Sequence, residues 1–191
     1  MKGAGDFFEP LAPPPPPSEP PRPKPWEQPD DIVGREVPLE VVIARSQTIA
    51  IIINRLTAYP NGFAFNLSLR AKPGHEMASD GFHGWRRRGA SVPSDEILRF
   101  GIQFADGSKV TNLQVFAYGA PGPPTPPILL GGGGGGSSNR SDFFFWVWPL
   151  PPPGPLLFVT EWPIEGIQLS RYEISSDAIR QAAEAAGHEL L

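Results

Sequence analysis

The stretch GFAFNLSLRA, residues 62 to 71, decides the fold class of this 191-residue chain. Its large apolar side chains alternate with small or polar ones, which is the two-residue period of a β-strand with one buried face. The run before it, TIAIIINRLTAY (48–59), is β-branched and apolar. Pro60, Asn61 and Gly62 join the two runs in the order of a type I turn closed by a left-handed glycine. The sequence therefore predicts an antiparallel hairpin here.

Further segments carry the same kind of pattern, and no helical pattern lies between them. In residues 97 to 116, alternating apolar residues flank Asp106 and Gly107, a pair that supplies the positive φ angles of a tight turn. The remaining strand-like runs are 37–45, 142–150, 155–163 and 166–174. About eight short strands joined by turns predict an all-β chain, an antiparallel β-sandwich of the immunoglobulin-like kind.

One short helix is expected after the last strand, in ISSDAIRQAAEAAGHELL. Ser175 or Ser176 can cap its start, Asp177 favours its first turn, and Gly187 marks its end. Alanines and one isoleucine form a narrow apolar stripe that suits close packing against a sheet.

Proline and glycine are concentrated in patches that set the domain limits. Residues 1–35 are proline-rich and poor in apolar side chains, which predicts a disordered tail, with a single domain over 36–191. PPRPKP (20–25) resembles an SH3-type ligand, although a plain disordered tail is the favoured interpretation. The glycine run lacks the preceding strand and following lysine of a phosphate-binding loop, so residues 118–142 are predicted to form a flexible surface loop.

Composition excludes several functional classes. The chain contains no cysteine, which removes disulfides, thiolate nucleophiles and cysteine-based metal sites, and no cofactor is predicted. A formal net charge of −4 argues against general nucleic-acid binding. Neither a signal peptide nor an apolar run of membrane-spanning length is recognisable, so we expect a soluble, cytoplasmic protein without membrane insertion.

The aromatic run DFFFWVW is apolar on both faces of its expected strand. One face carries Phe143, Phe145 and Val147, and the other carries Phe144, Trp146 and Trp148. Two interpretations stay open for the second face. The terminal helix or the proline-rich loops cover it within the domain, or it is a docking surface in which Phe144, Trp146, Trp148 and Trp162 take part.

The stretch FFFWVWPLPPPGPLLFVTEWPIEGI, residues 143 to 167, resembles uncharacterised bacterial proteins of actinobacterial type. They share a hairpin rich in tryptophan and proline near the carboxyl end. The resemblance covers about the last third of the chain and implies no known activity.

The loop after the first hairpin holds the residues with metal-ligand chemistry. His75 and His83 are eight positions apart in a glycine-broken segment, a spacing that fixes no geometry. The candidate ligand set is His75, Glu76, Asp80 and His83. Three consecutive arginines in the same loop could contact an anionic partner, but charge runs are usually solvated. They are Arg86, Arg87 and Arg88.

Glu161 and Glu165 flank Trp162, and paired carboxylates near an aromatic ring occur in glycoside hydrolases. Strand alternation turns Glu161 away from Trp162 and toward solvent, which disfavours catalysis there. The favoured hypothesis is thus a non-enzymatic domain that binds an unknown protein partner or itself. The alternative is a metal-binding protein or hydrolase that uses the loop around His75 and His83.

Overall fold

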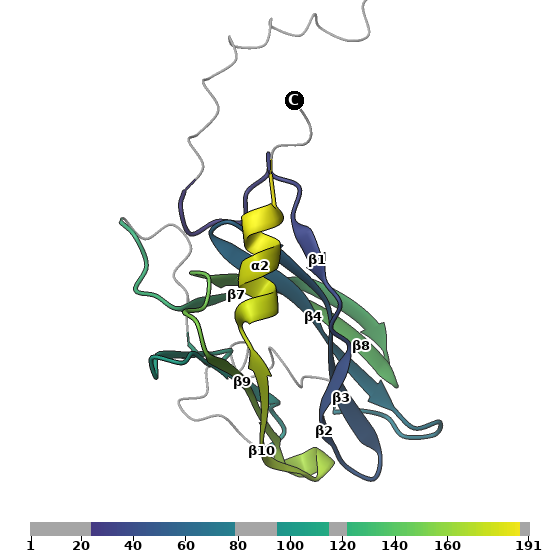
Figure 1. Ribbon diagram of the computed structural model, residues 1–191. Coiled ribbons are helices and arrows are strands. Elements are labelled where there is room, and N and C mark those ends of the chain that lie inside the picture. Colours follow the sequence, from purple (N-terminus) through teal and green to yellow (C-terminus); the bar gives the residue numbers. More distant parts are fainter. Residues whose placement is uncertain (1–23, 79–94, 115–121, 188–191) are drawn as a thin grey trace, which may run out of the picture.

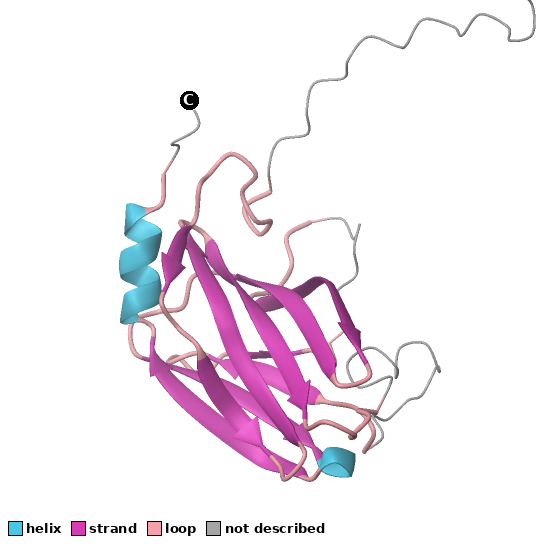
Figure 2. Cartoon of the chain, turned by 90° about the vertical axis from the view of Figure 1, so that its right-hand side faces the viewer, coloured by secondary structure: helices cyan, strands magenta, loops and turns pink. Residues whose placement is uncertain are grey.

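The computed structural model describes residues 24–78, 95–114 and 122–187. Within these ranges the chain forms two antiparallel sheets packed face to face as a sandwich (Figure 2). One short α-helix, α2 (Asp177–Ala185), lies against the side of the sheets (Figure 1). The prediction of an all-β chain with two antiparallel sheets and one terminal helix is confirmed.

The larger sheet, sheet 1, has six strands. They are β1 (Arg35–Val37), β2 (Val41–Arg45), β3 (Ile49–Tyr59), β4 (Gly62–Ala71), β7 (Ile128–Ser137) and β8 (Arg140–Trp148). Their order is β1-β3-β4-β8-β7, and β2 pairs with β3 along the same edge as β1. The single strand predicted over 37–45 is thus two strands, separated at Pro38, which has no N–H to donate.

The smaller sheet, sheet 2, has four strands in the order β10-β9-β5-β6. They are β5 (Arg99–Gln103), β6 (Lys109–Thr111), β9 (Pro155–Trp162) and β10 (Ile167–Ser175), with the 3-10 turn η1 (Pro163–Glu165) between the last two. Gly107 has the predicted positive φ, 85°, in the β5–β6 turn, whereas Asp106 is not among the described residues with positive φ, so the prediction is wrong for Asp106.

Phenylalanine rings from both sheets meet in the core. The ring centroid of Phe65 in sheet 1 lies 5.5 Å from that of Phe145 and 5.6 Å from that of Phe158 in sheet 2. Phe100 lies 5.9 Å from the same ring. All four side chains are at most 2% exposed. Aromatic burial on this scale dominates the stability of a domain of this size.

The β3–β4 hairpin forms where the sequence predicts it, but Gly62 has a different role. Tyr59 pairs with Gly62, which leaves Pro60 and Asn61 as a two-residue turn. Gly62 is not among the described residues with positive φ, so the prediction of a left-handed glycine is wrong. A Cβ at this position would lie 2.7 Å from Cη2 of Trp146. The glycine makes room for an indole ring rather than for a backbone turn.

The prediction that residues 118–142 form one loop is wrong for the glycine run, which lies in β7. This strand pairs along its length with β8, for example Gly134 with Phe143. A Cβ on Gly134 would lie 2.5 Å from the backbone oxygen of Asp142 and 2.9 Å from Cδ1 of Phe143. The exposed backbone edge of β8 supplies the pairing, and the missing side chains permit close approach.

Both ends of the described chain run beside sheet 1. Ile179 and Ala183 of α2 are buried, and the helix packs on β3 and β1. Val33 forms an isolated bridge with Gly187. Residues 24–34, which the sequence assigns to the tail, are therefore part of the described structure. No helix in the described ranges has the length and apolar character needed to span a bilayer.

Candidate functional site

The outer face of β8 carries three aromatic side chains, Phe144, Trp146 and Trp148, here called the outer aromatic row. Their neighbours Phe145 and Val147 point into the core, as the alternation predicts. The row is unevenly covered: Trp146 is 3% exposed, Trp148 is half-buried and Phe144 is 36% exposed. An outward-facing tryptophan that is buried must be covered by something outside sheet 1.

Residues 24–28, here called the amino-terminal arm, contact Trp146. The indole Nε1 donates a hydrogen bond to the backbone oxygen of Trp26 at 2.9 Å. The arm forms a turn, because Glu27 N donates to Lys24 O at 3.0 Å and Pro25 occupies the second position, where its fixed φ fits. A proline-containing turn therefore lies over this end of the row.

Asn61, at the tip of the β3–β4 hairpin, holds the same turn. Its Nδ2 donates to the backbone oxygens of Pro25 and Glu27, each at 2.8 Å. With the bond from Trp146, three consecutive carbonyls of the arm are bound by side chains of β8 and of the β3–β4 turn. Recognition runs through the peptide backbone of the arm, so it depends on the conformation of the turn more than on its side chains.

Tyr59 and Gly62 set the position of the Trp146 indole. The Tyr59 ring meets the indole edge to face, with centroids 5.6 Å apart and planes at 76°. Gln28 Nε2 donates to the Tyr59 hydroxyl at 2.8 Å. The indole occupies the space left by the missing side chain of Gly62. These contacts direct the indole N–H toward the arm.

A charged cluster lies next to Phe144 on the same face, centred on Asp142. Its carboxylate accepts hydrogen bonds from the Ser68 hydroxyl, from Arg70 Nη2 at 2.7 Å and from Arg140 Nε at 2.9 Å. Burial raises the pKa of Asp142, but these hydrogen bonds outweigh it and lower the pKa to about 2. Asp142 is therefore an anion at neutral pH that is already bound by its neighbours.

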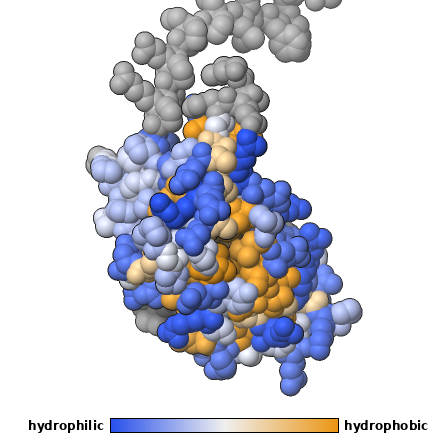
Figure 3. Space-filling model, viewed as in Figure 1, coloured by the Kyte–Doolittle hydropathy of each residue, from blue (hydrophilic) through white to orange (hydrophobic). Residues whose placement is uncertain are grey.

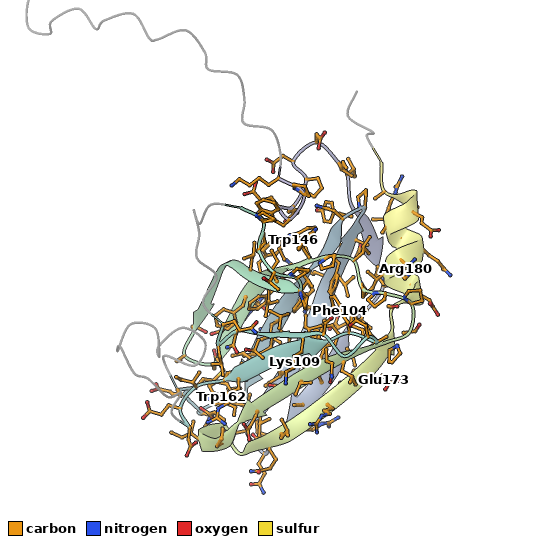
Figure 4. The ribbon with its side chains drawn as sticks, turned by 90° about the vertical axis from the view of Figure 1, so that its left-hand side faces the viewer. Phe104, Lys109, Trp146, Trp162, Glu173 and Arg180 are labelled. Carbon is orange, nitrogen blue, oxygen red and sulfur yellow. The ribbon has the colours of Figure 1, made fainter. Side chains whose placement is uncertain are left out.

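Trp162 does not belong to the outer aromatic row, and its assignment to a docking surface is wrong. Its side chain is 0% exposed. Its Nε1 donates a hydrogen bond at 2.9 Å to the backbone oxygen of Glu96, in the segment just before β5 of sheet 2. Figure 4 shows Trp146 and Trp162 at opposite ends of the molecule. The period of β9 turns Trp162 inward with Phe158, which is the orientation implied by the alternation that turns Glu161 toward solvent.

His75 from the predicted metal loop binds a residue that was not in the proposed ligand set. Its Nε2 lies 2.7 Å from Oε2 of Glu165, whose other oxygen accepts from Ala78 N at 2.9 Å. Glu165 is 8% exposed. Glu76 is exposed, and Asp80, His83, Arg86, Arg87 and Arg88 lie outside the described residues. No group of three metal-ligating side chains occurs in the described ranges.

The two carboxylates considered for glycoside hydrolysis have separate partners. Glu161 Oε2 lies 2.7 Å from Nη1 of Arg99 on the neighbouring strand β5. Glu165 binds His75. Each carboxylate is thus bound to a different basic side chain, and the two do not form a pair.

A second apolar surface lies on the side of the sandwich below α2. Figure 3 shows apolar residues gathered there, over the region where β2 and β10 run next to each other. Val41 of β2 and Ile174 of β10 are half-buried against the core. The outer aromatic row is the better-defined site, because Trp146 and Asn61 supply hydrogen-bond donors beside it.

Comparison of the chain with protein-family models, with curated proteins and with solved structures gives no match. The resemblance of residues 143–167 to actinobacterial proteins stays a prediction.

Sequence reasoning missed most of this site apart from Trp146. Asn61 was interpreted as a turn residue, and Lys24, Pro25 and Glu27 as part of a tail. The sequence offered only separate signals, a glycine in the hairpin turn and a tryptophan-rich strand far along the chain. The pairing of Phe63 with Val147 places the turn next to Trp146, but that register is visible only in three dimensions.

Proposed function

We propose that this chain is a non-enzymatic, cytoplasmic protein-binding domain whose contact surface is the outer aromatic row of sheet 1. One observation carries the proposal. Trp146 of the row and the neighbouring Asn61 already bind a peptide segment from outside both sheets, through hydrogen bonds to three backbone carbonyls. A surface that combines a tryptophan ring with donors aimed at carbonyls is suited to peptide recognition.

The fold in this proposal is an immunoglobulin-like sandwich. The strand orders support it: β3-β4-β8-β7 in sheet 1 and β10-β9-β5-β6 in sheet 2. With β3 taken as the first strand, these correspond to the A-B-E-D and G-F-C-C′ sheets of that fold. The fold alone assigns no function, so the proposal depends on the contacts of the outer aromatic row.

Two exposed apolar side chains, Phe144 and Val42, lie on this face of sheet 1 together with the polar residues of the charged cluster around Asp142. Val42 is opposite Ile52, Ile52 is opposite Ser68, and Ser68 is opposite Asp142, so these positions share one face. Phe144 is two residues from Asp142 and points the same way. Phe144 and Val42 are 36% and 39% exposed. Covering an exposed Phe contributes about 1 to 2 kcal/mol to association.

A photo-reactive benzophenone amino acid in place of Phe144 tests the proposal in cells. The matched control carries the same group in place of Glu173, an exposed residue of β10 on the other sheet. A discrete cross-linked product at position 144 that is absent at position 173 is expected, either a dimer of the chain or an adduct with another protein. Equal cross-linking at both positions would contradict the proposal.

Metal binding near His75 is the second candidate function. One observation favours it: a buried carboxylate, Glu165, holds the imidazole at 2.7 Å, an arrangement that often orients metal-binding histidines. Metal analysis of the purified chain is the test. Stoichiometric zinc, manganese or iron that disappears with His75→Ala would establish this function, and a metal content equal to that of the variant would exclude it.

A further inference from the structure

We infer that Trp146, Asn61 and Tyr59 form a binding site for a proline-containing peptide turn, which the amino-terminal arm fills and the same kind of turn from a partner protein displaces. This inference rests on the proposed function and adds the class of ligand and the means of control. It predicts that the arm of the free chain occupies this site, and that a partner must compete with residues 24–28 to bind there.

The ligand class follows from what the site contacts. The bonds from Asn61 and Trp146 all end on carbonyl oxygens of the arm. They require three carbonyls directed to one side, which the turn from Lys24 to Glu27 provides. Proline at the second turn position pre-sets the backbone and lowers the entropy lost on binding. An extended polyproline segment would present its carbonyls in a different pattern.

The arm is held as a ligand rather than as part of the core. Lys24, Pro25 and Glu27 are exposed, and the arm pairs with no strand. Its Lys24–Glu27 ion pair, at 3.0 Å, joins side chains that are 55% and 48% exposed, so it adds little. The segment is therefore attached mainly by the hydrogen bonds that a competing turn could replace.

The arm also leaves one buried group of the site unsatisfied. Asn61 Oδ1 is buried and has no hydrogen-bond partner among the described residues. Burial of an unpaired acceptor is unfavourable. A partner turn that supplies a donor to this oxygen would bind more tightly than the arm does, which provides a reason for exchange.

The site persists when the arm leaves, because other contacts hold its side chains. Asn61 O accepts a hydrogen bond from Leu150 N at 3.1 Å, which ties the hairpin tip to the segment after β8. Trp146 stays between Tyr59 and the gap at Gly62. A pre-formed site avoids the cost of ordering on binding.

Calorimetric titration with a blocked peptide of the sequence KPWEQPD, residues 24–30, tests the inference. The first protein is the full chain in which Lys24–Gln28 is replaced by Gly-Ser-Gly-Ser-Gly. We expect it to bind the peptide at least about tenfold more tightly than the native chain, whose own arm competes. Asn61→Asp in the replaced chain should abolish binding, because a carboxylate repels the peptide carbonyls. A peptide of five prolines should not bind.

Folding of the replaced chain is checked by its thermal transition. If it does not fold, Pro25→Gly serves instead, since it keeps the length of the arm and weakens the turn. The inference is overturned if a folded variant fails to bind the peptide, if pentaproline binds equally well, or if both variants fail to fold. Specific cross-linking at position 144 combined with no peptide binding would leave the proposed function standing and reject the ligand class.

Discussion

The indole nitrogen of Trp146 lies 2.9 Å from the backbone oxygen of Trp26, a residue 120 positions earlier in the sequence. Trp146 is on the outer face of a central strand, where a buried tryptophan requires a cover. Its N–H would cost free energy if it were buried without an acceptor. The arm covers the ring, and the carbonyl of Trp26 accepts the hydrogen bond of the indole N–H. The same contact connects the proline-rich amino-terminal segment to the aromatic strand.

Trp146 and Trp148 should differ in their effect on folding. Trp146→Ala removes a ring that is 3% exposed and should lower the free energy of unfolding by about 3 to 5 kcal/mol. Trp148 is half-buried, so Trp148→Ala should cost only about 1 kcal/mol. Denaturant unfolding of the isolated chain measures both. Equal losses would show that the whole row is a structural part of the domain.

Two neighbouring glycines of β7 provide a matched test of the glycine strand. A Cβ on Gly134 would meet backbone of β8 at 2.5 Å, whereas a Cβ on Gly135 would meet nothing within 4 Å. Gly134→Ala should therefore destabilise the domain by about 1 to 3 kcal/mol. Gly135→Ala should be neutral or stabilise it by about 0.5 kcal/mol, because it restricts the unfolded chain. If both substitutions are neutral in thermal unfolding, the run is a loop after all.

His75 should matter for stability through its partner. Removing the imidazole leaves the Glu165 carboxylate buried with only the Ala78 N–H, so His75→Ala should cost about 1 to 3 kcal/mol at pH 7. Glu76→Ala alters an exposed neighbour and should change stability by less than about 0.5 kcal/mol. A His75→Ala variant as stable as Glu76→Ala would mean that the pair contributes nothing to folding.

Asp142 should make folding sensitive to acid. Its folded pKa of about 2 lies below the ordinary value of 3.8, so the carboxylate binds fewer protons in the folded state than in the unfolded state. The resulting stabilisation, about 2 kcal/mol, is complete above the unfolded pKa and is lost as the pH falls from about 4 to 2. Unfolding curves over this range should show a steeper loss for the native chain than for Asp142→Asn. Parallel losses would contradict the assignment.

The sequence was sufficient for the parts of the fold that depend on side-chain periodicity. Phe63, Phe65, Leu67 and Leu69 alternate, and the strand they predict is β4. The glycine strand could not be predicted in this way, because Gly134 and its neighbours have no side chains to form a pattern and pair only through the backbone edge of β8.

The site was harder to predict than the fold for a related reason. Trp146 was identified because its strand is apolar on both faces. The sequence predicted the terminal helix or the proline-rich loops as its cover, whereas the arm, which was assigned to the tail, contacts it. The arm is bound through the carbonyls of Pro25, Trp26 and Glu27, and every sequence possesses such groups. The link between His75 and Glu165 spans 90 positions and has no local signature.

Hydrogen exchange of the tryptophan indole N–H groups, followed by nuclear magnetic resonance on the unmodified chain, tests the central claim most directly. Trp146 and Trp162 each donate to a backbone oxygen at 2.9 Å, but the first bond ends on the arm and the second lies in the core. If the arm detaches while the sandwich stays folded, the Trp146 indole should exchange at least about tenfold faster than that of Trp162. Equal rates, changing together with global stability, would show that the arm opens only when the whole domain unfolds and would contradict a displaceable cover over a binding site.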